Sequence, residues 1–230
     1  LDYYSVEIDN AITTLGADVI LSSCYSQATS DPEMCALIER NATSNTIINI
    51  IDTTTNAFGE TVSGLDFAVK YGLGTGVGRW GFGIDGTYLL GYDATIPDAT
   101  NAAGRTINGK GVYDLGVWPE LRMNAAISWS MDEWGAGLNA RYIGGFEECE
   151  DNDCTIDGAA KRSVEANTTM DLYASYTFEN PLGSTAFTMG VNNLLDQAPA
   201  VIYNGFLGTS DASTYDFVGR YVYARLTQSF

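Results

Sequence analysis

The sequence predicts an all-β fold, a transmembrane antiparallel β-barrel, for this chain of 230 residues. Three observations lead to this prediction. Apolar and polar residues alternate along stretches of about ten residues, the length of a tilted membrane strand. Aromatic residues stand near the ends of the apolar faces, as they do at membrane–water interfaces. Short turns rich in Gly, Pro and Asp alternate with long polar loops, as in outer-membrane barrels.

The composition excludes several other classes of protein. Lys and Arg total 11 against 29 Asp and Glu, the formal net charge is −18, and His is absent. Such acidity argues against nucleic acid as a partner, because binding it needs a basic face. Without His, and without carboxylates paired for catalysis, we predict no enzyme, no catalytic residue and no cofactor. No apolar run approaches the roughly 18 residues that a membrane helix needs.

The clearest strand runs from Trp80 to Tyr92. Its even positions are almost all large and apolar, whereas its odd positions are mostly small or polar. A soluble β-sandwich also alternates, but polar faces carrying Asp, Asn, Arg and Lys suit a wet lumen better than a dry core. The same pattern predicts nine strands, at residues 2–9, 46–55, 61–72, 79–95, 115–131, 134–148, 166–178, 184–195 and 217–229.

The connections predict which end of the strands faces which compartment. Tight turns at residues 72–78, 130–133 and 179–184 are expected in the periplasm, and long loops at 97–114, 147–165 and 196–216 outside the cell. An odd number of strands cannot close an antiparallel barrel. Because Leu1 also begins within a strand, we expect residues 1–230 to be the C-terminal part of a larger barrel.

Residues 10–45 predict a short helical insert on the periplasmic side. Four apolar residues between Ile12 and Ile20 have helical spacing. The run Ser30-Asp31-Pro32-Glu33 combines a capping residue, a first-turn proline and a capping-box glutamate, and predicts a helix to about Arg40. A solvated loop is the alternative.

The four cysteines are predicted to form two disulfides. Cys24 and Cys35 both lie in the insert, and Cys149 and Cys154 lie in one outer loop. A cross-pair would have to traverse the membrane, so topology selects Cys24–Cys35 and Cys149–Cys154. Both compartments permit disulfides. With two cysteines on each side and no His, no metal site is predicted.

The outer loop that holds the second pair is strongly acidic. It has six carboxylates between Glu147 and Asp157. Carboxylates this dense are potential Ca²⁺ ligands, but their spacing does not match an EF-hand loop. A solvated acidic loop is the simpler interpretation.

Several stretches resemble the TonB-dependent outer-membrane receptors. Residues 1–12 resemble a mid-barrel strand, and residues 24–41 resemble a helical periplasmic insert found in one proteobacterial branch. Gly190-Val-Asn-Asn-Leu-Leu-Asp-Gln-Ala-Pro199 is similar to the penultimate strand, although Leu195 replaces the usual phenylalanine. The end of the chain resembles the last strand, whose terminal aromatic (here Phe230) is read by the barrel assembly machinery. Gln228 departs from the usual apolar residue near that end.

The resemblance implies a bacterial outer-membrane protein with a 22-stranded barrel filled by an N-terminal plug. Its last nine strands would be in this chain, and the plug would not. It implies active import of a scarce ligand, a siderophore, an oligosaccharide or similar. The implied partners are outer-membrane lipid, the TonB complex acting through the plug, the barrel assembly machinery and the ligand. A passive porin or structural barrel is the alternative.

The candidate site residues fall into two groups. Residues of the outer loops that we expect to contact ligand are Tyr203, Asn204, Phe206, Asp151, Asp153 and Asp157. Polar strand residues that we expect to face the lumen are Asp85, Arg122, Asn124, Asn139, Arg141 and Asp171. For the second group, solvating the barrel interior or pairing with the plug is an alternative role.

Overall fold

A computed structural model of the chain describes residues 1–25, 31–98, 101–113, 116–149, 154, 158–203, 205 and 208–230. Within them, no helix is long and apolar enough to cross a bilayer. The chain forms two compact units. The wall unit comprises Leu1–Tyr4, Ser63–Leu90 and Lys110–Phe230, and the insert unit comprises Ser5–Val62 and Gly91–Gly109. Each unit is described by itself.

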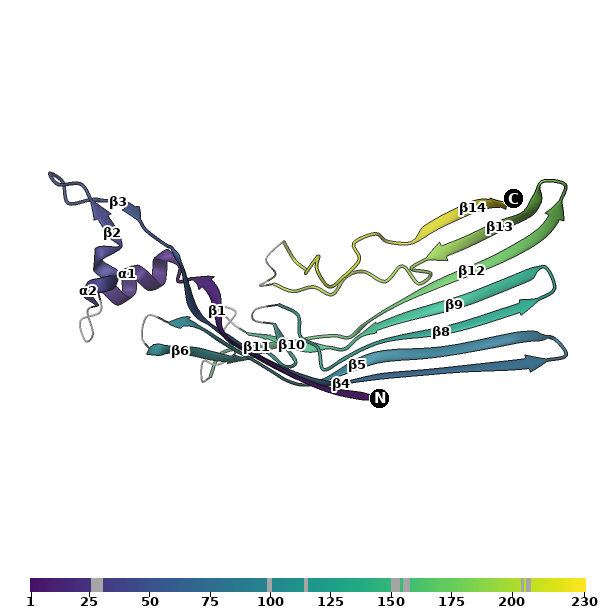
Figure 1. The fold of residues 1–230 in the computed structure, drawn as a ribbon, viewed down its shortest axis with the longest axis horizontal. Coiled ribbons are helices and arrows are strands. Elements are labelled where there is room, and N and C mark those ends of the chain that lie inside the picture. Colours follow the sequence, from purple (N-terminus) through teal and green to yellow (C-terminus); the bar gives the residue numbers. More distant parts are fainter. Residues whose placement is uncertain are drawn as a thin grey trace. The chain divides into compact units, whose positions relative to one another are not determined.

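The main sheet of the described chain is an antiparallel meander, which confirms the predicted all-β class (Figure 1). Eight of its strands follow in the order β1 (Asp2–Thr14), β4 (Thr54–Thr75), β5 (Gly78–Asp98), β8 (Leu121–Met131), β9 (Trp134–Ile143), β12 (Asn167–Asn180), β13 (Gly183–Asn192) and β14 (Tyr221–Ser229). The sheet is open, with β1 and β14 at its edges. A ninth strand, β6 (Asn101–Asn108), pairs with β5 outside this order.

These strands differ from the predicted set. The expected strand at 46–55 is absent from the main sheet, because β3 (Ile47–Ile50) pairs with β2 (Ile38–Arg40) instead. The expected strand at 61–72 is the second part of the longer β4. The expected strand at 134–148 breaks after Ile143, and β10 (Phe146–Cys149) follows in a separate three-stranded sheet.

Alternation gives the strands of the wall unit an apolar face and a polar face. On the apolar face, Ile84 lies opposite Ala125, Ala125 opposite Ala140, and Ala140 opposite Met170. Large side chains of this face are exposed, including Phe82 at 39%. A continuous exposed apolar surface of this kind is a contact surface rather than a water-facing one. It suits lipid.

Aromatic rings concentrate on the apolar face toward the tight turns. The ring centroids of Trp80 and Trp129 are 6.4 Å apart, and those of Trp134 and Tyr176 are 4.8 Å apart. Trp and Tyr favour the headgroup level of a bilayer, where one end of the side chain stays wet. The aromatic band therefore indicates a membrane boundary near the turns.

On the polar face, tyrosine rings lie over glycines of the neighbouring strand. Tyr173 lies opposite Gly137, and Tyr223 opposite Gly190. A Cβ added at either glycine would collide with the tyrosine ring. These glycines therefore provide room for close ring-to-backbone packing between strands.

The three tight turns and the C-terminus lie at one end of the wall unit's strands (Figure 1). The turns join β4 to β5, β8 to β9, and β12 to β13. Ser229 lies opposite Ser184, next to the last of these turns. The predicted turns and the predicted downward direction of the last strand agree with this arrangement.

The helical insert follows the other strand ends. Helices α1 (Ala17–Tyr25) and α2 (Pro32–Ala36) lie between the end of β1 and the start of β4, whereas the tight turn follows the end of β4. β1 runs antiparallel to β4, because Gly64 approaches Tyr4 and Gly59 approaches Ile8. In chain order the insert therefore follows the strand ends opposite to the tight turn after β4, whereas the prediction expects it on the tight-turn side. The expected barrel strand at 46–55 accounts for this difference, because one additional strand reverses the direction expected for β1.

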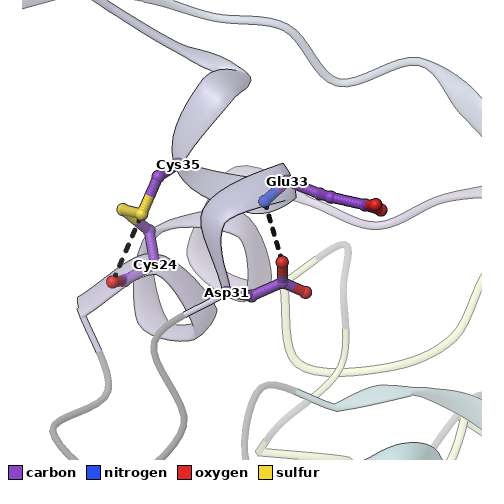
Figure 2. The surroundings of a disulfide bond; sticks show 4 residues. All are labelled: Cys24, Asp31, Glu33 and Cys35. Atoms are coloured by element: carbon purple, nitrogen blue, oxygen red, sulfur yellow. Dashed lines mark hydrogen bonds between the residues drawn. A yellow bond between two sulfur atoms is a disulfide. The ribbon is translucent and has the colours of Figure 1, made fainter.

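A disulfide and a small apolar core hold the insert together. Cys24 of α1 is bonded to Cys35 of α2 (Figure 2), and Ile20, Cys24 and Ile38 are buried. The Asp52 carboxylate accepts the backbone N–H groups of Leu15 and Gly16 at 3.1 and 3.2 Å. These two bonds join the two ends of the insert.

Helix α2 begins as predicted but is shorter. The Asp31 carboxylate accepts the Glu33 backbone N–H at 2.8 Å (Figure 2). Pro32 is the first helical residue. The helix ends at Ala36, not near Arg40, because the next residues form β2 and pair with β3.

Both predicted disulfides are confirmed, since Cys149 is bonded to Cys154. Each bond joins two cysteines of one connection between strands, at sequence separations of 11 and 5 residues.

Replacing Cys24 and Cys35 together by alanine should destabilise the insert by about 2 kcal/mol, because the disulfide restricts the unfolded chain. Limited proteolysis should cut residues 15–53 faster while the strands stay protected. The Cys149→Ala/Cys154→Ala variant is the matched control and should leave the insert's cleavage rate unchanged. Equal cleavage of the insert with and without its disulfide would contradict this account.

Candidate functional site

The polar face of the wall unit carries all six side chains that we expected to face the lumen. In the strand register, residues 85, 124 and 141 lie opposite one another across β5, β8 and β9, and residue 139 lies opposite 171. Residues opposite one another or two apart share a face of a sheet. One polar surface therefore contains Asp85, Arg122, Asn124, Asn139, Arg141 and Asp171.

A hollow of about 460 Å³ lies on this surface. Asn124 donates a hydrogen bond to the Asp85 carboxylate at 3.0 Å, and the Thr87 hydroxyl donates to Asp66 at 2.5 Å. Each of these two carboxylates is thus held by a side chain on the neighbouring strand. Arg122 and Arg141 add positive charge to the lining.

A second hollow of about 450 Å³ shares Arg141 with the first. Asp171 lines it and accepts the backbone N–H of Asn193 at 2.8 Å. Asn139 lines neither hollow. In the described part of the chain, the Arg141 guanidinium has no hydrogen-bond or ion-pair partner, so it is available to an incoming acceptor.

Arg122 contacts the connection before β8, and its charge acts on Asp211 in the loop after β13. Its guanidinium donates to the Val117 carbonyl at 2.6 Å. In the loop after β13, the Asp211 carboxylate accepts the backbone N–H and hydroxyl of Ser213 and the hydroxyl of Thr214, at 2.8 to 3.0 Å. Burial opposes ionisation of Asp211. The hydrogen bonds and the charge of Arg122 outweigh it and lower the pKa of Asp211.

Acid should therefore loosen this loop. Because the folded-state pKa of Asp211 lies below its ordinary value of 3.8, the stabilisation is complete above that value and is lost as pH falls through the folded-state pKa. Hydrogen exchange of the Ser213 amide should show its protection weakening at low pH in the wild type, with a smaller pH dependence in Asp211→Asn. An identical pH dependence in both proteins would contradict the assignment.

Beneath the loops lies an apolar core. It includes residues from β7 (Val112–Tyr113), β10 and β11 (Lys161–Val164), which form a three-stranded sheet. Loops that share a core move together rather than independently. The buried members are Tyr113, Val117, Ile143, Phe146, Val164, Ile202 and Tyr215.

Removing the Tyr215 hydroxyl should stabilise this core. The hydroxyl is buried and has no hydrogen-bond partner among the described residues, and burial raises the pKa of Tyr215 to about 12. An unsatisfied buried hydroxyl is costly, so Tyr215→Phe should raise local stability by about 1 kcal/mol. Hydrogen exchange of the Ile202 amide measures it. Lower protection in Tyr215→Phe would show that the hydroxyl has a stabilising partner.

A buried carboxylate joins two of the outer loops. Glu148 of β10 is 4% exposed and forms an ion pair with Arg162 of β11. Its other carboxylate oxygen accepts the Tyr203 backbone N–H at 2.9 Å. Arg162 also donates to the Val201 carbonyl at 2.5 Å, and its guanidinium lies 4.5 Å from the centroid of the Tyr203 ring.

Tyr203 is therefore a fixed residue of the outer-loop region. The other candidates for ligand contact, Asn204, Phe206, Asp151, Asp153 and Asp157, lie outside the described residues. Within the described ranges, no group of three or more His, Cys, Asp or Glu residues is arranged to hold a metal ion.

Several site residues were missed from the sequence. Asp66, Asn193 and Asp216 line the hollows, and Glu148 is buried. The spacing of Asp211 to its two hydroxyl partners is a recognisable turn pattern and was available as a signal. No local sequence pattern indicates that the Glu148 side chain is buried.

Comparison with known proteins agrees with this architecture. The family model described as TonB dependent receptor-like, beta-barrel matches residues 1–194. No curated protein and no solved structure matches the chain. Proteins of this family are bacterial outer-membrane transporters that act with TonB. The chain therefore belongs to the TonB-dependent receptor family and forms part of its β-barrel.

Proposed function

We propose that this chain forms part of the barrel wall and outer loops of a receptor that imports a scarce ligand, such as a siderophore or an oligosaccharide, by TonB-dependent transport. The observation that supports the proposal most strongly is the two-faced sheet. One face exposes a continuous apolar surface, which suits contact with lipid, and the other carries charged and amide side chains, which suit a hydrated passage.

The polar face has two roles in this proposal. A plug supplied from outside residues 1–230 fills the interior at rest and contacts the polar face. When TonB moves the plug, the hydrated lining gives the ligand a wet path. Arg141 is suited to contact both, because it lines both hollows.

In this proposal the end of the wall unit that carries the long loops faces the outside of the cell. The insert is a compact element by itself, held together by its disulfide and by the Asp52 contacts. At the opposite end, Phe230 follows β14 and is 97% exposed, which suits recognition by the assembly machinery.

Channel recordings separate import from the alternative, a passive porin. The intact receptor, purified from outer membranes and inserted in a planar bilayer, should show no steady conductance, because the plug occludes it. A steady open conductance without TonB would support the porin and contradict active import. In cells, uptake should also stop when TonB is removed.

A further inference from the structure

We infer that Tyr203 is a stacking platform for an uncharged sugar ring on the outer-loop surface. This inference rests on the proposed import function and names its ligand class.

Contacts with Glu148 and Arg162 hold Tyr203 in place. Its backbone N–H donates to buried Glu148 at 2.9 Å, and the Arg162 guanidinium lies 4.5 Å from the ring centroid. Arg162 is itself held by Glu148 and by the Val201 carbonyl. The ring nevertheless remains 70% exposed. An aromatic side chain that is both immobilised and exposed loses little conformational entropy when a ligand binds it.

The charges around the ring are already paired. Arg162 pairs with Glu148, and the neighbouring Lys161 pairs with Glu147 at 3.7 Å. Both cations of β11 are thus matched to carboxylates of β10. Neither offers a free positive charge to an anionic ligand.

The wider loop is negative. Residues 147–165 contain seven Asp and Glu against two Lys and Arg. The whole chain is acidic as well, with a formal net charge of −18. A protein with this balance repels anions on approach, and the effect strengthens at low ionic strength. Anionic ferric complexes and acidic sugars are therefore disfavoured.

The exposed face of the Tyr203 ring indicates which class of ligand binds. The face of an aromatic ring is electron-rich and attracts the weakly positive C–H groups of a flat apolar surface. A neutral pyranose presents such a face, and its hydroxyl groups can bond to surrounding polar groups. An uncharged oligosaccharide can therefore stack on the Tyr203 ring and is not repelled by the negative charge of the protein.

The test is an array of neutral and uronic-acid oligosaccharides probed with the intact receptor in detergent. At least one neutral glycan should bind, and the uronic-acid glycans should not. With that glycan, Tyr203→Ala should weaken binding about tenfold, whereas Tyr203→Phe should stay within about threefold. Tyr25→Ala is the matched control, because Tyr25 is also exposed and lies over an arginine, Arg40, at 5.6 Å. It should bind like the wild type.

Two results would overturn the inference: no neutral glycan on the array binds, or Tyr203→Ala binds the glycan as the wild type does. Unboiled gel migration of each variant shows whether it is folded. TonB-dependent uptake of an anionic ferric complex, unaffected by Tyr203→Ala, would reject the sugar platform and leave active import standing. A steady conductance of the purified receptor would reject active import without affecting glycan binding.

Discussion

Replacing Gly183 by alanine should prevent the last strands of the wall from assembling. Gly183 begins β13 with a φ of +117°, a backbone conformation that L side chains rarely adopt. A Cβ there would also collide with the carbonyl oxygen of Ser229 on β14. Backbone cannot move aside as a flexible side chain does, so the turn and the pairing of β13 with β14 should both be lost. Unboiled gel migration and trypsin resistance measure the folded fraction in the outer membrane.

Gly208→Ala is the control for Gly183→Ala. Gly208 also has a positive φ, +82°, but a Cβ there would meet nothing within 4 Å. This variant isolates the backbone strain, about 1 kcal/mol, from the collision. It should assemble almost normally. Normal assembly of Gly183→Ala would show that the turn is not constrained as described.

Replacing Arg162 by methionine should loosen the outer loops by about 3 kcal/mol. The change leaves the Glu148 carboxylate, 4% exposed, without its ion-pair partner. Breaking a buried ion pair from one side typically costs about 3–5 kcal/mol, and the lower end applies because the Arg162 side chain is 38% exposed. Hydrogen exchange of β10 and β11 amides measures the loss.

The double variant Glu148→Gln/Arg162→Met tests the cause. Glutamine keeps an oxygen that can accept the Tyr203 N–H but carries no charge. Stability should therefore return most of the way to that of the wild type. If Arg162→Met changed protection by less than about 0.5 kcal/mol, as an exposed pair would, the ion pair would not be holding the loops.

The transmembrane strands were predictable because their two environments differ. Positions from Trp80 to Tyr88 and from Leu121 to Met131 alternate between an apolar side and a polar side, and the sequence shows that alternation directly. The two disulfides and the start of α2 were also predictable, because each of these features joins residues that lie close together in the sequence. The six lumen candidates share one face because they obey the same period.

The remaining features depend on contacts between distant residues. The first part of β4, at 54–62, carries polar residues on both faces, so no alternation marks it as a strand. Without this signal, the sequence predicts a strand at 46–55 and an insert on the tight-turn side, whereas the structure has β3 and β4 there. The loop core brings Tyr113, Phe146 and Ile202 together from three connections, and none of them is distinctive locally.

The central claim is that the sheet is a membrane wall with lipid on one face and a hydrated passage on the other. Nitroxide labels at Ile127→Cys and Ser128→Cys, neighbours on β8, test it in the intact receptor in lipid. The label at 127 should be relaxed mainly by dissolved oxygen, which concentrates in lipid. The label at 128 should be relaxed mainly by a water-soluble nickel complex. If both labels respond alike, to oxygen or to nickel, the sheet does not separate lipid from water and the account is wrong.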